Sequence, residues 1–259
     1  MRAYKVFVTV LSLCCAAAAV AQTAPPNRSV STGVVEPARS VILAAKVTGR
    51  INTINAEEGQ RVATGDELIR LDAAELEAEL ASAIGSMALA ETELAYKRKV
   101  QERMQRLGKS KSVSQDRVDD AQFDHAVARD RLAIAKAALA RVRARLAETR
   151  LVAPFDGVIT ARDAEVGQLT QPGTPLLVLE DHSRLDFRTL VKEQDIPHIG
   201  NGDAVTVTID ALGGIGLQGK VSQIIPSGDR KTHAFEVEVT LPAHEKLFPG
   251  MFGKAEFNY

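Results

Sequence analysis

The sequence predicts an elongated α+β protein: a β sandwich made from two separated sequence copies, a helical hairpin between them, and a small antiparallel β-barrel after the second copy. Three observations support this prediction. Residues 43–72 return without a gap as residues 151–180, which indicates one backbone built twice. The intervening segment changes to a heptad pattern, and the chain after Asp181 alternates with a period of two.

The first 21 residues have the features of a secretory signal. Arg2 and Lys5 form a basic start, residues 6–20 are apolar, and Ala19-Val20-Ala21 is a small-x-small site that predicts cleavage after Ala21. The apolar run is short for a membrane span. Residues 22–40 are then expected to form a linker and a first strand.

Both cysteines, Cys14 and Cys15, lie inside this signal, so the mature chain has no disulfide and no thiol chemistry. Lipid attachment at Cys14 is an alternative, but Leu13 stands where a small residue is expected. We expect a protein of the bacterial periplasm. A formal net charge of −1 gives no field that would attract nucleic acid.

The two copies, assigned to residues 41–72 and 151–181, keep their glycines and apolar residues in phase. Short alternating segments are separated by glycines, as in strands joined by tight turns. The residues of the first copy that recur 108 positions later are Leu43, Ala45, Gly49, Ile51, Ala56, Glu57, Gly59, Gln60, Gly65, Leu68 and Leu71.

Residues 73–150 are expected to form an antiparallel hairpin of two long helices. Apolar residues recur at spacings of three and four from Ala73 to Met104 and again from Val118 to Thr149, which predicts a seam on each helix. His125 falls on the second seam, where we expect a tolerated polar residue. About 35 residues per helix predict a rod of roughly 50 Å.

The sequence also predicts where these helices begin and end. Asp72 with Glu75, and Ser112 with Gln115, fit the capping-box pattern, and residues 108–111 are expected to form the turn. Each helix begins with acidic residues and ends with basic ones, which complements its own dipole. When the helices are antiparallel, the acidic start of each also faces the basic end of the other.

After Asp181 the chain is expected to form a barrel domain over residues 182–259. A short helical turn at residues 193–199 is expected to cover one mouth. The predicted strands are residues 184–191, 204–209, 217–225, 234–241 and 251–257.

The copies resemble half of a biotinyl or lipoyl domain, through residues 151–159 (LVAPFDGVI) and Val166-Gly167-Gln168. The resemblance implies a split lipoyl-like domain, or barrel-sandwich hybrid. In carrier enzymes the modified lysine occupies the turn between the halves. Here residues 73–150 replace that turn, and neither junction has a lysine; Lys46 is far along the chain. A biotin or lipoate carrier is therefore disfavoured, and an adduct seen by mass spectrometry would support it.

Near the hairpin tip, at about residues 107–114, the spacing of Arg103, Leu107, Ser114 and Asp119 resembles the tip motif of periplasmic adaptors of RND-type tripartite efflux pumps. These adaptors are membrane fusion proteins of the HlyD-like family. The resemblance implies that the four residues bind a TolC-like outer-membrane channel. Arginine suits carbonyl or carboxylate acceptors, and leucine supplies an apolar anchor. The alternative is structural: a solvated Arg103, with Leu107 and Ser114 closing the coil.

The barrel segment resembles the same adaptors, and the resemblance covers nearly all of residues 41–257 in the family's domain order. Longer members carry a further membrane-proximal β domain, whose contacts are not transferred to this chain. The matching stretches are residues 202–205, 219–221, 225–226 and 247–251.

The resemblance implies a non-enzymatic connector in the periplasm, associated with the inner membrane, without cofactor, metal or nucleic-acid ligand. Its expected partners are an inner-membrane RND transporter, a TolC-like channel and further copies of itself, in a hexamer or a trimer of dimers. An adaptor of an ABC exporter or of a type I secretion system is an alternative, and so is a passive coiled-coil scaffold.

Overall fold

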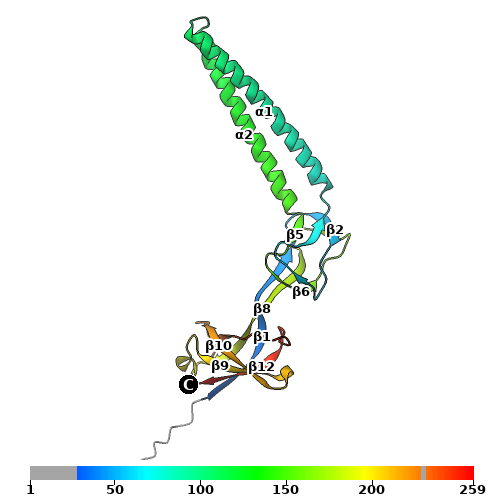
Figure 1. The fold of residues 1–259 in the computed structure, drawn as a ribbon, viewed down its shortest axis with the longest axis vertical. Helices are drawn as coiled ribbons and strands as arrows, with labels where there is room; N and C mark the ends of the chain where they lie inside the picture. Colours follow the sequence, from blue (N-terminus) through cyan, green and yellow to red (C-terminus); the bar gives the residue numbers. More distant parts are fainter. Residues whose placement is uncertain (1–27, 229–231) are drawn as a thin grey trace, which may run out of the picture.

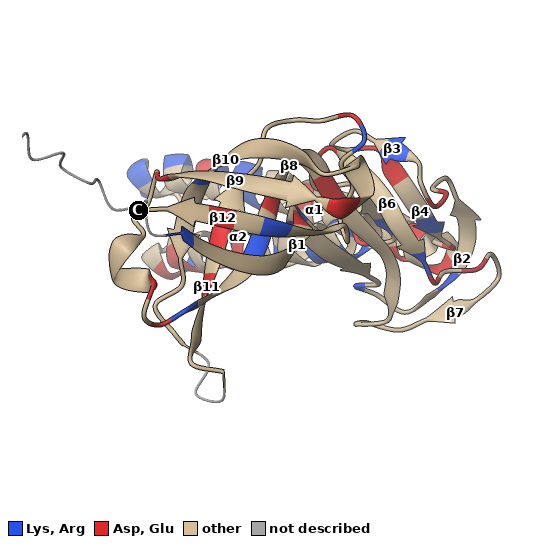
Figure 2. Ribbon diagram, turned by 90° about the horizontal axis from the view of Figure 1, so that it is seen from below, with Lys and Arg blue, Asp and Glu red and all other residues tan. Residues whose placement is uncertain are grey.

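The computed structural model describes residues 28–228 and 232–259, and the predicted signal at residues 1–21 lies outside them. The molecule is elongated, with a helical hairpin at one end, a small β unit in the middle and a barrel at the other end (Figure 1). Seen from below (Figure 2), acidic and basic residues are interspersed over the ribbon, and the formal net charge is −1. The predicted fold class is confirmed.

The β unit repeats its strands at the interval found in the sequence. Each strand of the first copy has a counterpart 108 residues later, and the counterpart of β4 is the beginning of the long strand β8. The strands are β2 (Gly49–Ile54), β3 (Arg61–Val62), β4 (Glu67–Leu71), β5 (Arg150–Val152), β6 (Gly157–Arg162), β7 (Leu169–Thr170) and β8 (Pro175–Lys192).

The two copies hold each other through reciprocal backbone hydrogen bonds. The Gly59 amide donates to the Ile159 carbonyl at 2.8 Å, and the equivalent Gly167 amide donates to the Ile51 carbonyl at 2.8 Å. Both glycines have positive φ, 82° and 86°, which a residue with a Cβ adopts at a cost. Their apolar residues form one core, and Ile51 and Ile159 are both buried in it. The unit is therefore one sandwich assembled from both copies.

Two long strands, β1 (Arg28–Ala44) and β8, belong to both β regions. β1 pairs with β12 (Phe252–Asn258) through its first half and with β8 along the rest, so it contributes to the barrel before it enters the sandwich. The sequence predicted a linker and a first strand for residues 22–40. It did not predict that this strand would belong to both the barrel and the sandwich.

The barrel is completed by β9 (Ala204–Ile209), β10 (Ile215–Ile224) and β11 (Ala234–Thr240). It closes in the order β1, β12, β9, β10, β11, β8 and back to β1. Its core is a separate cluster that includes Phe187, Val207 and Val237. A 3₁₀ turn (Ile196–His198) lies within the expected cover at residues 193–199, and a second turn follows β9 (Asp210–Leu212).

The hairpin consists of α1 (Ala74–Lys109, 36 residues) and α2 (Gln115–Ala147, 33 residues). Every residue that the two helices bury lies on a predicted seam, but the remaining seam residues of α1, such as Met87 and Leu94, are only half-buried. The buried residues are Ala90 on α1 and Val118, Ala121, Ala128, Leu132, Leu139 and Val142 on α2. Among the described residues, no helix combines the length and hydropathy that a bilayer span requires.

Ion pairs join the helices as their charge patterns predict. Near the base, Arg145 donates to Glu79 at 3.1 Å, and further out Lys97 donates to Asp124 at 2.6 Å. The bond to Asp124 raises the pKa of Lys97. Because the pairs connect the acidic start of each helix to the basic end of the other, they favour the antiparallel register.

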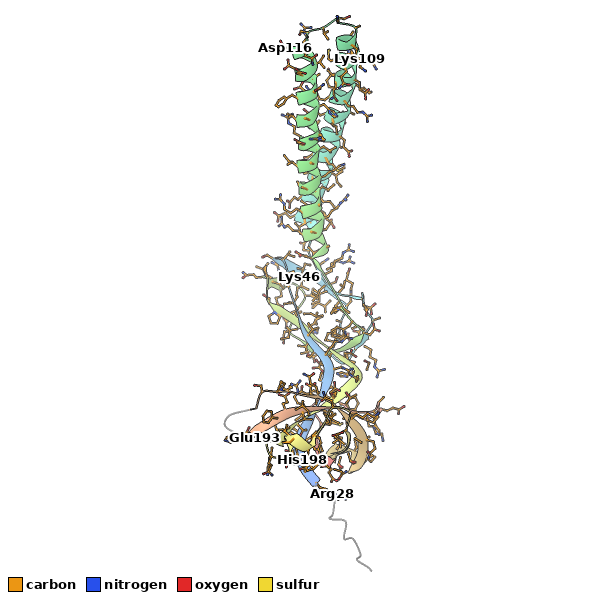
Figure 3. The ribbon with its side chains drawn as sticks, turned by 90° about the vertical axis from the view of Figure 1, so that its left-hand side faces the viewer. Arg28, Lys46, Lys109, Asp116, Glu193 and His198 are labelled. Carbon is orange, nitrogen blue, oxygen red and sulfur yellow. The ribbon has the colours of Figure 1, made fainter. Side chains whose placement is uncertain are left out.

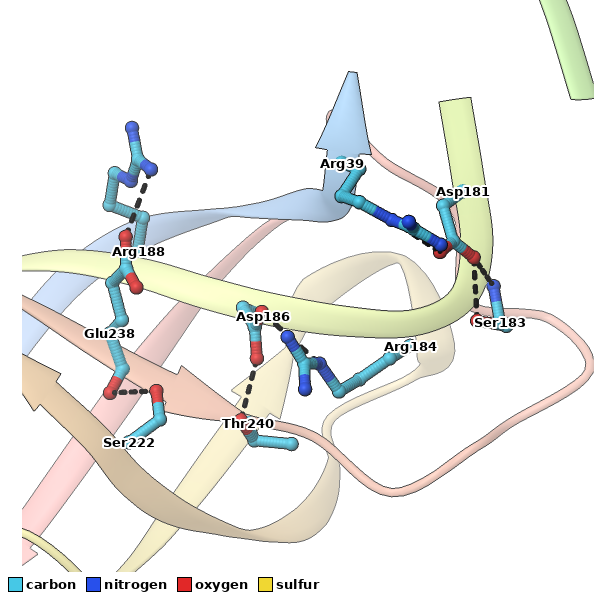
Figure 4. Close-up of polar contacts among 9 residues, drawn as sticks. All are labelled: Arg39, Asp181, Ser183, Arg184, Asp186, Arg188, Ser222, Glu238 and Thr240. Carbon is cyan, nitrogen blue, oxygen red and sulfur yellow. Dashed lines mark hydrogen bonds and ion pairs between the residues drawn. The ribbon is translucent and has the colours of Figure 1, made fainter. Parts of the chain in front are cut away.

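A small polar cluster marks the waist where β1 and β8 pass from the barrel into the sandwich (Figure 4). Arg39 on β1 donates to Asp181 on β8 at 2.7 Å, and its guanidinium lies 4.4 Å from the centre of the Phe155 ring. Ser183 also donates to Asp181. Together these contacts connect both long strands with the β5–β6 loop at the passage between the two β regions.

Candidate docking site at the hairpin tip

The tip is a tight connection between α1 and α2, closed by backbone and hydroxyl groups. The Ser112 amide donates to the Leu107 carbonyl at 2.9 Å, and the Ser110 hydroxyl donates to the same carbonyl at 2.9 Å. Lys111 has a positive φ of 56°. These bonds use the carbonyl that the end of α1 leaves free, so the short turn is ordered by its own chain.

Two local predictions at the tip are wrong. The turn begins after Lys109 and not at Gly108, and Ser112 with Gln115 does not form a capping box. Ser114 precedes α2 in an extended conformation and makes no side-chain cap bond. The Ser112 hydroxyl lies instead 3.0 Å from the Ser110 hydroxyl, because the turn itself uses this side chain.

Gly108 is a tip residue whose role the sequence reading missed. It continues the seam four residues after Met104, and a Cβ at this position would lie 2.9 Å from a methyl group of Val118 on α2. The glycine therefore lets the two helices approach closely just before the turn. The three-and-four spacing of the seam was the signal that could have identified it.

The structure brings the four predicted docking residues to the last turns of the hairpin. Arg103 and Leu107 are one helical turn apart on α1, so they share a face. Ser114 and Asp119 lie at the start of α2. All four are exposed, and Leu107 has 36% of its surface accessible, so the group is available to a partner.

Arg103 and Asp119 differ in how they are held. The Gln115 side chain donates to Asp119 at 2.9 Å, which orients the carboxylate along α2. Glu102 is paired with Arg98 at 3.0 Å. Within the described part of the chain, no side-chain hydrogen bond or ion pair holds Arg103, so its guanidinium can extend towards an acceptor on another molecule.

The tip is the part of the hairpin most distant from both β regions. Figure 3 places Lys109 and Asp116 at the far end of the rod, with Lys46 near its base and Arg28, Glu193 and His198 at the end of the barrel. A helix of 36 residues has a length of about 50 Å. The exposed tip residues are therefore separated from the barrel by the full hairpin and the sandwich.

The structure places Lys46 nearer to the start of the hairpin than its position in the sequence suggested. Although it is far from the junctions along the chain, in space it borders a pocket of about 480 Å³ at the hairpin base together with Asp72 and Glu75. The junctions themselves contain no lysine. Within residues 28–228 and 232–259, no group of three or more His, Cys, Asp or Glu side chains is placed to hold a metal ion.

Comparison with known proteins gives two family matches that cover most of the chain. Residues 39–180 match the family described as RND MFP (membrane fusion protein), barrel-sandwich hybrid domain. Residues 188–259 match the CusB-like β-barrel domain. The first match alone spans more than half of the 259 residues.

Individual relatives agree with this assignment. The multidrug resistance protein MdtA of Proteus mirabilis is 28% identical over 241 residues, which cover 90% of this chain and 59% of MdtA. The chain thus spans little more than half of that relative. MacA of Actinobacillus actinomycetemcomitans has the same fold, with a TM-score of 0.78 at 19% identity over 90% of this chain and 78% of MacA.

ZneB of Cupriavidus metallidurans is a further structural neighbour, with a TM-score of 0.56 at 25% identity over 89% of this chain and 97% of ZneB. The repeated half-motifs, the hairpin between them and the closed barrel occur here in one chain and in the family's order. This chain belongs to the RND membrane fusion proteins, the adaptor family of efflux pumps.

Proposed function

We propose that this chain is the periplasmic adaptor of a tripartite efflux system that exports small molecules. It connects an inner-membrane RND transporter to a TolC-like outer-membrane channel, after export directed by residues 1–21 and cleavage after Ala21. The observation that carries the proposal is the exposed tip group, which a rod of about 50 Å holds away from the β regions.

Each end of the molecule has a distinct part in this proposal. The tip residues Arg103, Leu107, Ser114 and Asp119 bind the channel, where arginine supplies directed hydrogen bonds and leucine an apolar anchor. The barrel end binds the transporter. Several copies surround the export route and form a ring, so transport energy comes from the partner and not from this chain.

Substitution at the tip tests the channel contact. Arg103→Asp and Leu107→Asp, made in cells whose export depends on this chain, are expected to abolish export because each places a carboxylate at the contact. Gln105→Asp is the matched control, since Gln105 is exposed on the same helix between them. Export that persists in both tip variants, at unchanged protein levels, would contradict channel docking.

The source of energy tests the choice of transporter. For an RND partner, collapse of the proton gradient stops export even when cellular ATP is maintained. Export that continues under this condition would favour an ABC partner. This measurement does not depend on the contact between the tip and the channel. The identity of the transporter and the binding of the channel are therefore tested separately.

A further inference from the structure

The barrel seam between β1 and β8 is closed by backbone pairing over only part of its length. Towards the end of the barrel that lies opposite the hairpin (Figure 3), the last pair is Gly33 with Thr189. Beyond it, residues 28–32 of β1 pair with β12, and residues 190–192 of β8 pair with β11. Within the described part of the chain, these two strand edges therefore face each other without backbone pairing. We name this opening, between residues 28–32 and 190–192, the seam slot.

The hydrogen bonds of β1 show which of its backbone groups point into the slot. The Val35 amide and carbonyl both bond to residues just before β12. A residue of an antiparallel strand directs its N–H and C=O to one side, and the next residue directs them to the other. Val30 and Thr32 therefore direct their backbone groups away from β12 and into the slot. In agreement, the Thr189 hydroxyl donates to the Thr32 carbonyl at 2.8 Å.

The same reasoning identifies the backbone groups that β8 contributes. The Leu185 carbonyl accepts a hydrogen bond from the Leu241 amide, which directly follows β11. Leu190 and Lys192 are therefore in the opposite phase and direct their backbone groups away from β11 and into the slot. Each edge of the slot thus presents N–H donors and C=O acceptors, as an exposed sheet edge does.

A pocket of about 520 Å³ lies at the slot and is lined by residues of both edges. Val30 and Leu190, which line it from opposite edges, are 58% and 53% exposed. Arg28 and Lys192, at the ends of the two edges, add positive charge to the lining. The pocket therefore combines apolar surface and positive charge with the backbone groups of two strand edges.

One carboxylate, that of Asp195, is among the described residues that line the pocket. The Ser29 hydroxyl donates to it at 2.6 Å, and the Tyr259 hydroxyl also donates to it. These bonds lower the pKa of Asp195, so its negative charge is present and is used inside the chain. The positive charges of Arg28 and Lys192 outnumber it, which favours a ligand with acidic groups.

A second polypeptide is the ligand that satisfies both kinds of backbone group in the slot. An extended segment supplies carbonyls to the N–H groups of an edge and N–H groups to its carbonyls, as in β-strand addition. A small anion would bind the N–H groups and the two cations, but it would leave the Val30 carbonyl without a donor. The slot therefore fits an extended acidic peptide better than an anionic headgroup.

We propose that an extended segment of the transporter adds as a β-strand to the edge of β1 in the seam slot. The segment pairs with the backbone of Val30 and Thr32 and packs apolar side chains against Leu190. Its acidic side chains lie against Arg28 and Lys192. The choice of the transporter rests on the proposed function, because the slot lies at the end of the barrel opposite the tip (Figure 3).

A proline substitution tests the backbone contact. A tagged RND transporter, the one on which export depends, is recovered from solubilised membranes of cells without the outer-membrane channel, and the amount of this chain bound to it is measured. Val30→Pro removes the N–H that points into the slot and keeps the pairing with β12. It is expected to reduce recovery by about tenfold or more. Val30→Ala keeps this N–H and is expected to reduce recovery by no more than about threefold.

A disulfide across the slot is a second test, which does not require the strand to tolerate proline. Thr32 and Leu190 follow the last backbone pair on the two edges, so Thr32→Cys with Leu190→Cys is expected to link them and close the slot. The oxidised variant is expected to lose the transporter, and reduction is expected to restore binding. Thr208→Cys with Lys254→Cys links the paired strands β9 and β12 outside the slot and is expected to bind in both redox states.

Charge reversal in the same assay tests the acidic character of the segment. Lys192→Glu is expected to reduce recovery, with a smaller loss at high salt. Equal recovery of Val30→Pro and Val30→Ala, or of the oxidised and reduced slot variant, would overturn strand addition, and a loss confined to Lys192→Glu would do the same. An unchanged chain that is not recovered with the transporter would overturn the proposed function, and this contact with it.

Discussion

At the scale of single residues, the waist shows how a few polar groups join two β regions. Asp181 accepts hydrogen bonds from Ser183 and Arg39, and these bonds lower the pKa of its carboxyl from the usual 3.8 to about 2. Its side chain is only 7% exposed, whereas that of Arg39 is 60% exposed. The bonds therefore stabilise a carboxylate that is largely removed from water, although solvent weakens the arginine contribution.

This depressed pKa predicts a specific loss of stability in acid. Because the folded state holds the proton less tightly than the unfolded chain, the contribution of Asp181 is complete above about pH 4 and disappears as the pH falls towards 2. Asp181→Asn is expected to lower the free energy of unfolding by about 1–2 kcal/mol at neutral pH. Urea unfolding across this pH range measures the difference, and a difference that remains constant down to pH 2 would contradict the assignment.

The repeat provides a matched pair of glycines in which only one has no room for a side chain. A Cβ on Gly157 would collide with the Glu180 carbonyl oxygen, whereas on the equivalent Gly49 it would lie 3.3 Å from Leu71 Cβ. Gly157→Ala is expected to destabilise the protein by about 1–3 kcal/mol. Gly49→Ala is expected to change stability by less than about 1 kcal/mol. Thermal unfolding of both variants checks this, and equal losses would refute the asymmetry.

At the scale of elements, the hairpin is a narrow coil that depends on its seam. Leu139 is 4% exposed between the helices, whereas Leu89 points away from the seam. Most of the seam consists of alanine and leucine, which permits close packing but leaves few large side chains to share the stabilisation.

Truncation of a seam leucine is therefore expected to loosen the hairpin. Leu139→Ala should destabilise the helices by about 2–4 kcal/mol through lost contacts and a cavity. Leu89→Ala, in dilute protein, should change stability by less than about 0.5 kcal/mol. Far-UV circular dichroism during heating follows the helices directly. If the two variants unfold at similar temperatures, the hairpin does not derive its stability from the seam.

Prediction from the sequence succeeded where a pattern extended over many residues. The interval of 108 residues located β2 and β6 at equivalent positions, and the three-and-four spacing identified the seam. It failed at both capping patterns, each of which rests on only two residues. Ala73 and not Asp72 precedes α1, without a side-chain cap bond, and the turn uses the Ser112 hydroxyl. The dual membership of β1 and β8 was not predictable, because periodicity reports which side of a strand is buried but not which strand lies beside it. The docking role of Arg103 stays a prediction.

At the scale of the whole molecule, the sandwich is complete without the hairpin. The chain leaves it after Leu71 and returns near Thr149, and the Leu71 amide donates to the Thr149 carbonyl at 2.8 Å. The exit and the entry are thus adjacent strand ends. The reciprocal bonds between the copies, such as those of Gly59 and Gly167, do not involve α1 or α2.

Replacing residues 74–147 with a short Gly/Ser linker is therefore expected to leave a folded β protein. The helical circular dichroism signal should disappear while a cooperative thermal transition of the β regions remains. Export should be lost because the tip is absent. A variant that fails to give any cooperative transition would mean that the hairpin is needed to bring the two copies together.

The sharing of β1 and β8 has a mechanical consequence. These strands are continuous from the barrel into the sandwich from which the helices project, so a tilt of the barrel passes along two hydrogen-bonded strands to the base of the rod. The rod then acts as a lever: over a length of about 50 Å, each degree of tilt at its base displaces its end by about 1 Å.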